Sequence, residues 1–158
     1  MTQTLSRATL HQDSMSWLRP KKLPPLLGAP DEVIDALCSR VEYYGNQTLV
    51  WQFYIGRSSR IETRQRAHDS DDYAVLYETE SFEDAMEVEG RLIRAFQGHF
   101  KYNNRGLSSG GGRSHRTPNL VYIAWWWPRA AGIPRRRTDP RPDDHPVNDW
   151  VDRYHGLG

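Results

Sequence analysis

The chain has 158 residues, with 21 Lys and Arg against 20 Asp and Glu, which gives a formal net charge of +1 at pH 7. This length fits one domain with one core, and the balanced charge excludes a globally basic surface, so any nucleic-acid binding must come from local basic patches. The single cysteine, Cys38, excludes an internal disulfide and a zinc site built from cysteines. Because no apolar run reaches the roughly 20 residues of a membrane span and the N-terminus lacks a signal-peptide pattern, we expect a soluble, cytoplasmic protein without membrane contact.

Composition divides the chain into three parts. Residues 1–29 form a basic, proline-containing N-terminal arm, and residues 30–127 contain the aromatic clusters at 51–54 and 125–127. From residue 128 onward the chain is rich in Pro, Arg and Asp, and such a segment buries too little apolar surface to order itself alone. We therefore expect a folded domain at 30–127, followed by a Pro/Arg-rich C-terminal tail at 128–158.

The first part of this domain predicts a helix and a hairpin. Pro30 and the acidic residues after it suit a helix start, and apolar residues at helical spacing predict a helix over about 31–39. Two β-branched and aromatic runs follow, Val41–Tyr44 and Leu49–Ile55, with Gly, Asn and Gln between them. This pattern is typical of an antiparallel hairpin.

Four further elements complete the predicted fold. Ile61–His68 is polar and suits a short helix, and Tyr73–Tyr77 suits a strand. Ser81 opens the strongest helical pattern, Phe82–Phe96, which has an apolar face that must pack on the sheet. The apolar run Leu120–Trp127 predicts a late strand. Together the elements predict an α+β fold with a small, mostly antiparallel sheet flanked by helices.

Several polar residues at defined positions on this scaffold are candidates for a catalytic site. Arg64 and His68 are four residues apart, so they share one face of the short helix. Glu89 lies between the apolar residues Val88 and Leu92 on the long helix, where a naked carboxylate needs a partner such as a metal ion. The candidate site therefore draws on many elements: Tyr44, Tyr54, Arg64, His68, Glu89 and Asn103.

In its central part the chain resembles the GIY-YIG nucleases. Tyr54-Ile55-Gly56 matches the second signature, Arg57 and Ser58 follow it, and Arg64 and His68 come at a typical spacing. Ala85–Ile93 looks like the catalytic-helix pattern of this family, and Tyr102-Asn103 resembles the segment that supplies its asparagine. The resemblance covers about residues 40–104 and implies a GIY-YIG-like fold.

The first signature of that family departs from the pattern. It would fall on Glu42-Tyr43-Tyr44, where only the tyrosine agrees, so Tyr43 competes with Tyr44 for the site position. The consecutive residues Asn103 and Asn104 leave a similar choice of one residue.

The resemblance implies hydrolysis of a phosphodiester with one divalent metal, Mg²⁺ or Mn²⁺, bound by Glu89. Arg64 would hold phosphate oxygens through two parallel hydrogen bonds. Tyr44 and Tyr54 would position the attacking water, one of them as general base. A tyrosine titrates near ~10, so that role needs either a relay for its proton or a pKa lowered by Arg57, by Arg64 or by the metal.

The remaining implied roles concern the proton and the backbone. His68 would accept or shuttle the proton, and Asn103 would fix the backbone of the site. A second set of residues would contact the nucleic-acid backbone without reading its sequence. It consists of Arg60, Arg66, Arg105, Arg113, Arg116, Arg135, Arg136 and Arg137.

Each of these side chains also has a structural explanation. Tyr44 and Tyr54 fit sheet residues with a solvated hydroxyl, and Arg64 and His68 fit the wet face of a short helix. Glu89 competes with other acidic residues as one more solvated helix charge. The basic runs equally fit a surface loop and a solvated linker.

The sequence as a whole predicts a metal-dependent endonuclease that acts on DNA, with sequence preference supplied by the arms, the glycine-rich loop or homodimer formation. Two alternatives stay open. One is a nucleic-acid-binding module of the same fold that does not cut, and the other is a nuclease directed at RNA.

Overall fold

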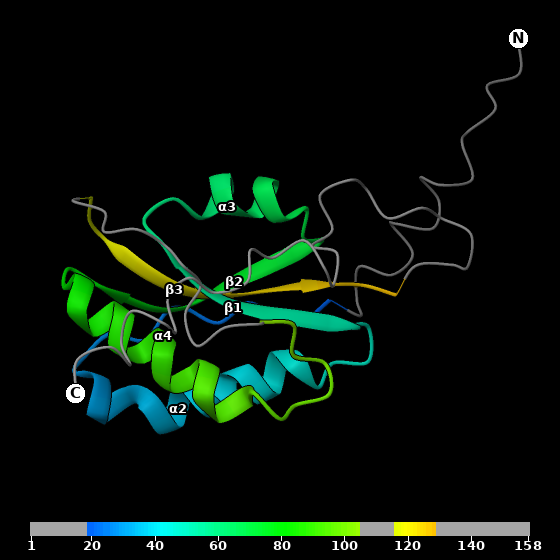
Figure 1. Cartoon of the computed structure of the whole chain (residues 1–158), viewed down its shortest axis with the longest axis horizontal. Helices are drawn as coiled ribbons and strands as arrows, with labels where there is room; N and C mark the ends of the chain where they lie inside the picture. Colours follow the sequence, from blue (N-terminus) through cyan, green and yellow to red (C-terminus); the bar gives the residue numbers. More distant parts are fainter. Residues whose placement is uncertain (1–18, 105–115, 129–158) are drawn as a thin grey trace, which may run out of the picture.

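Three strands and three helices make up the described part of the chain. The computed structural model describes residues 19–104 and 116–128. The elements are α2 (Pro30–Gly45), β1 (Gln52–Ser58), α3 (Ile61–His68), β2 (Asp72–Thr79), α4 (Phe82–Phe96) and β3 (Asn119–Trp126). The strands form an antiparallel sheet, with α2 and α4 on one face and α3 on the other (Figure 1). The predicted α+β class is confirmed.

The strand that comes last in the chain lies in the middle of the sheet. The order is β1-β3-β2, and β3 pairs antiparallel with both neighbours. Side chains of a strand alternate between faces, so Phe53 and Ile55 of β1 face α2 and α4, whereas Tyr54 lies on the α3 face. In β3, Tyr122 shares that α3 face.

The main core lies between the sheet and the helices α2 and α4. It contains the buried apolar face of α4 together with inward residues of all three strands. Helix α4 starts where the sequence predicts, because the Ser81 hydroxyl accepts a hydrogen bond from Asp84 N at 3.1 Å. The predicted bounds Ile61–His68 and Phe82–Phe96 are confirmed as α3 and α4.

The predicted hairpin is wrong in its first half. Val41–Tyr44 forms the last turn of α2, which runs to Gly45 instead of ending near residue 39. The reason is tertiary packing, since Leu37, Val41 and Tyr44 recur at helical spacing and are all buried against the sheet. The second half is a strand, but β1 begins at Gln52 and continues past Gly56 to Ser58.

Both outer edges of the sheet are covered by other segments. Leu26 N donates to Leu76 O at 2.9 Å and Glu78 N donates to Leu26 O at 3.1 Å, so the chain before α2 runs along β2. Along β1, Phe53 N donates to Lys101 O and Asn103 N donates to Phe53 O, each at 2.9 Å. These contacts occupy part of each edge strand.

The division into arm, domain and tail stays a prediction. Residues 1–18 and 129–158 lie outside the described part, while residues 19–29 are bonded to the sheet. Within the described residues, the helices are too short or too polar to cross a membrane.

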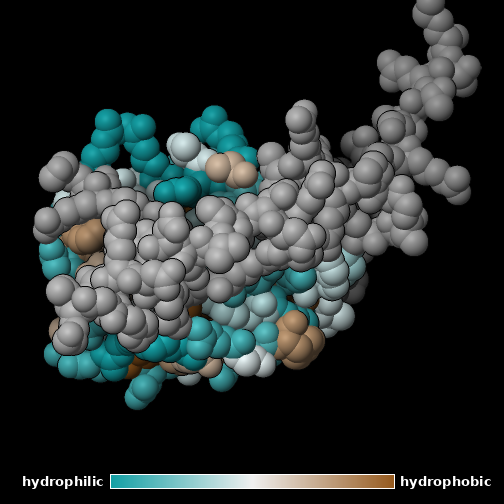
Figure 2. Space-filling model, in the orientation of Figure 1, coloured by the Kyte–Doolittle hydropathy of each residue, from teal (hydrophilic) through white to brown (hydrophobic). Residues whose placement is uncertain are grey.

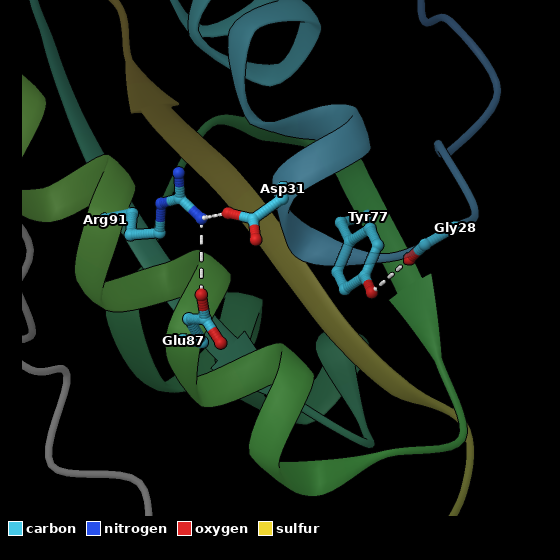
Figure 3. Close-up of polar contacts among 5 residues, drawn as sticks. All are labelled: Gly28, Asp31, Tyr77, Glu87 and Arg91. Carbon is cyan, nitrogen blue, oxygen red and sulfur yellow. Dashed lines mark hydrogen bonds and ion pairs between the residues drawn. The ribbon is translucent and has the colours of Figure 1, made fainter.

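Surface contacts join α2 to α4. Arg91 Nη1 on α4 lies 2.5 Å from Asp31 Oδ1 on α2 and 3.2 Å from Glu87 Oε1 (Figure 3). The same view shows the hydroxyl of Tyr77 on β2, which donates to Gly28 O at 2.8 Å. Because Asp31 is 87% exposed, this ion pair contributes little to stability. Elsewhere the described surface that is visible in Figure 2 is mostly hydrophilic, with separate apolar patches.

Candidate active site

Two tyrosines from neighbouring strands meet over a glycine. Tyr54 and Tyr122 lie on the α3 face with ring centroids 6.3 Å apart, and Gly56 is the direct register partner of Tyr122. A Cβ atom at Gly56 would lie 2.8 Å from the Tyr122 hydroxyl oxygen and 2.5 Å from Tyr54 Cε1. The glycine of the Tyr-Ile-Gly signature is therefore the residue that lets both rings approach the backbone.

The Gly56→Ala variant tests this convergence. We expect it to lose about 1–3 kcal/mol of stability, because the added methyl group forces two packed rings to move. Urea unfolding followed by circular dichroism measures the loss. Gly98→Ala is the matched control, since a Cβ atom there meets no atom within 4 Å. Equal unfolding midpoints for the two variants would contradict the described packing at Gly56.

Ionisable groups from three elements act on the pKa of Tyr122. Burial raises the pKa of its phenol, the Tyr54 phenol and the Glu89 carboxylate raise it further, and the Arg64 guanidinium opposes them. Burial also raises the pKa of Tyr102, again with contributions from Tyr54 and Glu89. Tyr54 and Glu89 therefore act on both Tyr102 and Tyr122, although these residues are far apart in sequence.

Because its pKa is raised, the Tyr122 phenol is protonated at neutral pH. A protonated phenol donates a hydrogen bond but cannot accept a proton as a general base. The expectation of a lowered pKa concerned Tyr44 and Tyr54; for Tyr44, burial raises the pKa instead.

Helix α3 brings Arg64 and His68 to the same face of the sheet. The His68 ring centroid lies 5.0 Å from that of Tyr54, with the planes 33° apart. Arg64 is half-buried, and its charge reaches Tyr122. The prediction that Arg64 and His68 share one helix face directed at the sheet agrees with these contacts.

Glu89 lies on α4, on the opposite side of the sheet from the rings of Tyr54 and Tyr122, and is paired with Arg57. The Arg57 Nε atom lies 3.4 Å from Glu89 Oε2, and the two side chains are only 6% and 1% exposed. The Arg57 guanidinium also lies over the Phe82 ring, 4.3 Å from its centroid. Glu89 is fully buried on α4, deeper than the edge of the packing, and Arg57 is a charge partner.

The side chain that holds β1 belongs to Asn104. Its Oδ1 accepts from Ile55 N at 2.8 Å, and its Nδ2 donates to Ile55 O at 2.6 Å. Asn103 contacts the same strand through its backbone, by the hydrogen bond to Phe53 O. Of the two candidates, Asn104 therefore makes the contact that was expected of Asn103.

Tyr44 does not join the Tyr54 cluster. It lies in α2 on the opposite face of the sheet, where its ring stacks on Trp125 at 5.4 Å and its hydroxyl accepts from Leu23 N at 2.8 Å. Tyr43 is 38% exposed, and its hydroxyl donates to Lys21 O at 3.5 Å. The placement of either tyrosine on a first strand is wrong because this segment is helical.

Tyr122 is the residue that sequence reasoning missed. Its strand was predicted, and the alternation along Leu120–Trp127 separates Tyr122 and Ala124 from Val121 and Ile123. No local pattern indicates that β3 lies between β1 and β2, so the sequence alone does not predict the pairing of Tyr122 with Gly56.

Three of the arginines expected at a nucleic-acid backbone lie in the described residues. Arg60 and Arg66 are exposed at α3, which covers the face of Tyr54, and Arg116 is exposed before β3. The other predicted contacts lie outside the described residues: Arg105, Arg113, Arg135, Arg136 and Arg137.

Among the described residues, Glu89 is the carboxylate that was expected to hold a metal ion. Within residues 19–104 and 116–128, no three His, Cys, Asp or Glu side chains gather where they could hold a cation. Mg²⁺ and Mn²⁺ bind through one or two carboxylates and take their other ligands from water and substrate phosphate. The chemistry of Glu89 fits that mode of binding.

No protein-family model, curated protein or solved structure matches the chain. The likeness to the GIY-YIG nucleases therefore depends on the sequence motifs alone. The activity that this likeness implies is a proposal.

Proposed function

We propose that the chain is a metal-dependent endonuclease that hydrolyses phosphodiester bonds in DNA through a GIY-YIG-type site. One observation carries the proposal: the rings of Tyr54 and Tyr122 converge over Gly56, within electrostatic reach of Arg64 and Glu89. A guanidinium, two phenols and a carboxylate from four elements are groups that can bind phosphate, position water and hold a cation in phosphodiester hydrolysis.

The chain's own groups have distinct roles in this proposal. Arg64 donates hydrogen bonds to oxygens of the scissile phosphate. Tyr122, which stays protonated, donates a hydrogen bond to the phosphate or to the attacking water. His68 lies against Tyr54 and is the group suited to take up the proton of that water. Water attacks phosphorus, and the bond from phosphorus to the 3′ oxygen breaks.

Glu89 is the residue that would hold Mg²⁺ or Mn²⁺. When bound, the cation supplies positive charge that stabilises the phosphate and the leaving oxygen. Arg57 fixes the orientation of Glu89 through their ion pair, and Asn104 fixes the backbone of β1 at Ile55.

The contact between Arg57 and Glu89 also favours a second candidate function. Because Glu89 is 1% exposed and its Oε2 contacts Arg57, the carboxylate equally serves as one half of a buried structural ion pair. A chain of that kind would bind nucleic acid through α3 and its arginines without cutting it. Cleavage assays separate the two functions.

Removal of Arg64 tests the proposal. Purified protein is incubated with supercoiled plasmid, single-stranded DNA and structured RNA, in Mg²⁺, in Mn²⁺ and in chelator. We expect DNA cleavage that depends on metal and that falls by more than about ten-fold in Arg64→Ala, since a charge-assisted hydrogen bond to phosphate is worth about 1.5–3 kcal/mol.

The matched control is Arg94→Ala, which removes one positive charge from an exposed position on α4. We expect it to cut at the wild-type rate. Binding without cleavage in every metal would support the second candidate, and preferential cleavage of RNA would change the substrate class.

A further inference from the structure

Phe100 presents an aromatic ring to solvent just after α4. It is 86% exposed, the highest value among the large apolar residues that the described chain exposes. Its ring stacks on His99, with centroids 4.9 Å apart and planes 13° apart. His99 in turn packs against Phe53 and Phe96, at centroid distances of 5.1 Å and 6.3 Å. Through His99, the exposed Phe100 ring is therefore connected to aromatic residues of the core.

A fixed cation lies beside this ring. The Lys101 ammonium is 5.7 Å from the Phe100 ring centroid, and it donates to Gly45 O at 3.1 Å and to Gln47 O at 3.2 Å. An aromatic face next to a cation is the combination that binds unpaired nucleotides, because the base stacks on the ring and the phosphate is attracted by the charge.

The ring is close along the chain to the segment that holds β1. Three residues separate Phe100 from Asn104, whose side chain holds Ile55 of the Tyr-Ile-Gly segment. The four steps from Phe100 to Asn104 span at most about 14 Å, the length of roughly four stacked nucleotides at 3.4 Å each.

We propose that Phe100 stacks on an unpaired base of the nucleic acid whose phosphate lies at Arg64, with Lys101 at the adjoining phosphate. This inference rests on the proposed function and adds the substrate class, a strand with at least one unpaired base within a few nucleotides of the cut. A duplex base offers no free face to the ring because its neighbours cover both faces.

The test measures binding in chelator, so that no cleavage is needed. A fluorescent single-stranded oligonucleotide, its duplex and an abasic strand of equal length are titrated with wild type and with variants of Phe100. We expect Phe100→Ala and Phe100→Leu to weaken binding of the single strand roughly ten-fold, as for loss of one stacked base. Phe100→Tyr retains binding because it keeps the aromatic face.

Two controls make the outcome specific. Met86→Ala removes another exposed apolar side chain from the first half of α4 and leaves binding unchanged. The abasic strand binds wild type and Phe100→Ala alike. The inference is overturned if Phe100→Ala binds the single strand as wild type does, if it loses the abasic strand equally, or if wild type binds no oligonucleotide. Plasmid cleavage by wild type in Mg²⁺ is scored separately, so a nuclease without base stacking is recognised as such.

Discussion

Glu89→Ala is expected to destabilise the fold by about 3–5 kcal/mol. The substitution removes the carboxylate that Arg57 contacts, while the guanidinium stays 6% exposed against the Phe82 ring. A buried charge that loses an opposite charge in contact with it carries a larger share of the cost of its desolvation. Urea unfolding monitored by circular dichroism measures the effect.

Two further variants show whether the ion pair is the cause. Arg57→Met combined with Glu89→Leu replaces both charges with apolar groups, and we expect it to recover most of the lost stability. Arg91→Ala breaks an exposed ion pair with Asp31, and we expect a cost below about 1 kcal/mol. If the double variant were as unstable as Glu89→Ala, the cost would come from packing and not from the buried charge.

Tyr122→Phe is expected to lower the rate of DNA cleavage roughly 10²-fold, the effect of removing one donor aimed at developing charge. Phenylalanine keeps the ring over Gly56, so the packing beside Tyr54 is retained and only the hydroxyl is lost. Single-turnover cleavage of plasmid in Mg²⁺ measures the rate, and thermal unfolding of the same sample checks that the fold is intact.

The elements with strong local signals were predictable from the sequence. Helix α4 has a capping serine and an apolar face repeated over four turns, so its bounds follow from short-range patterns. The sequence pattern predicts that helix α2 ends near residue 39, because Val41, Tyr43 and Tyr44 are residue types that favour strands. Packing of Val41 and Tyr44 against the sheet overrides that preference.

Long-range pairing was not predictable from the sequence. The Tyr-Ile-Gly motif indicated Tyr54 and Gly56, and the apolar neighbours of Glu89 indicated its burial. The second phenol is contributed by Tyr122, about seventy residues after Tyr54 in the chain. Its position depends on the sheet order β1-β3-β2, which no periodicity encodes.

Which of the two neighbouring asparagines contacts β1 through its side chain was likewise not predictable from the sequence. Asn103 and Asn104 are equivalent as sequence letters, and only the register of residues 101–104 along β1 decides which side chain reaches Ile55. A shift of one residue in an extended segment turns the side chain to the other face.

The cleavage rates of Tyr122→Phe and Tyr44→Phe, measured side by side, test the central claim most directly. Both variants remove one phenolic hydroxyl, but Tyr44 lies on the α2 and α4 face, where its hydroxyl accepts from Leu23 N. The account predicts a roughly 10²-fold slower rate for Tyr122→Phe and a wild-type rate for Tyr44→Phe, with about 1 kcal/mol lost in stability. A wild-type rate for Tyr122→Phe together with a slow Tyr44→Phe would contradict the placement of the site on the α3 face.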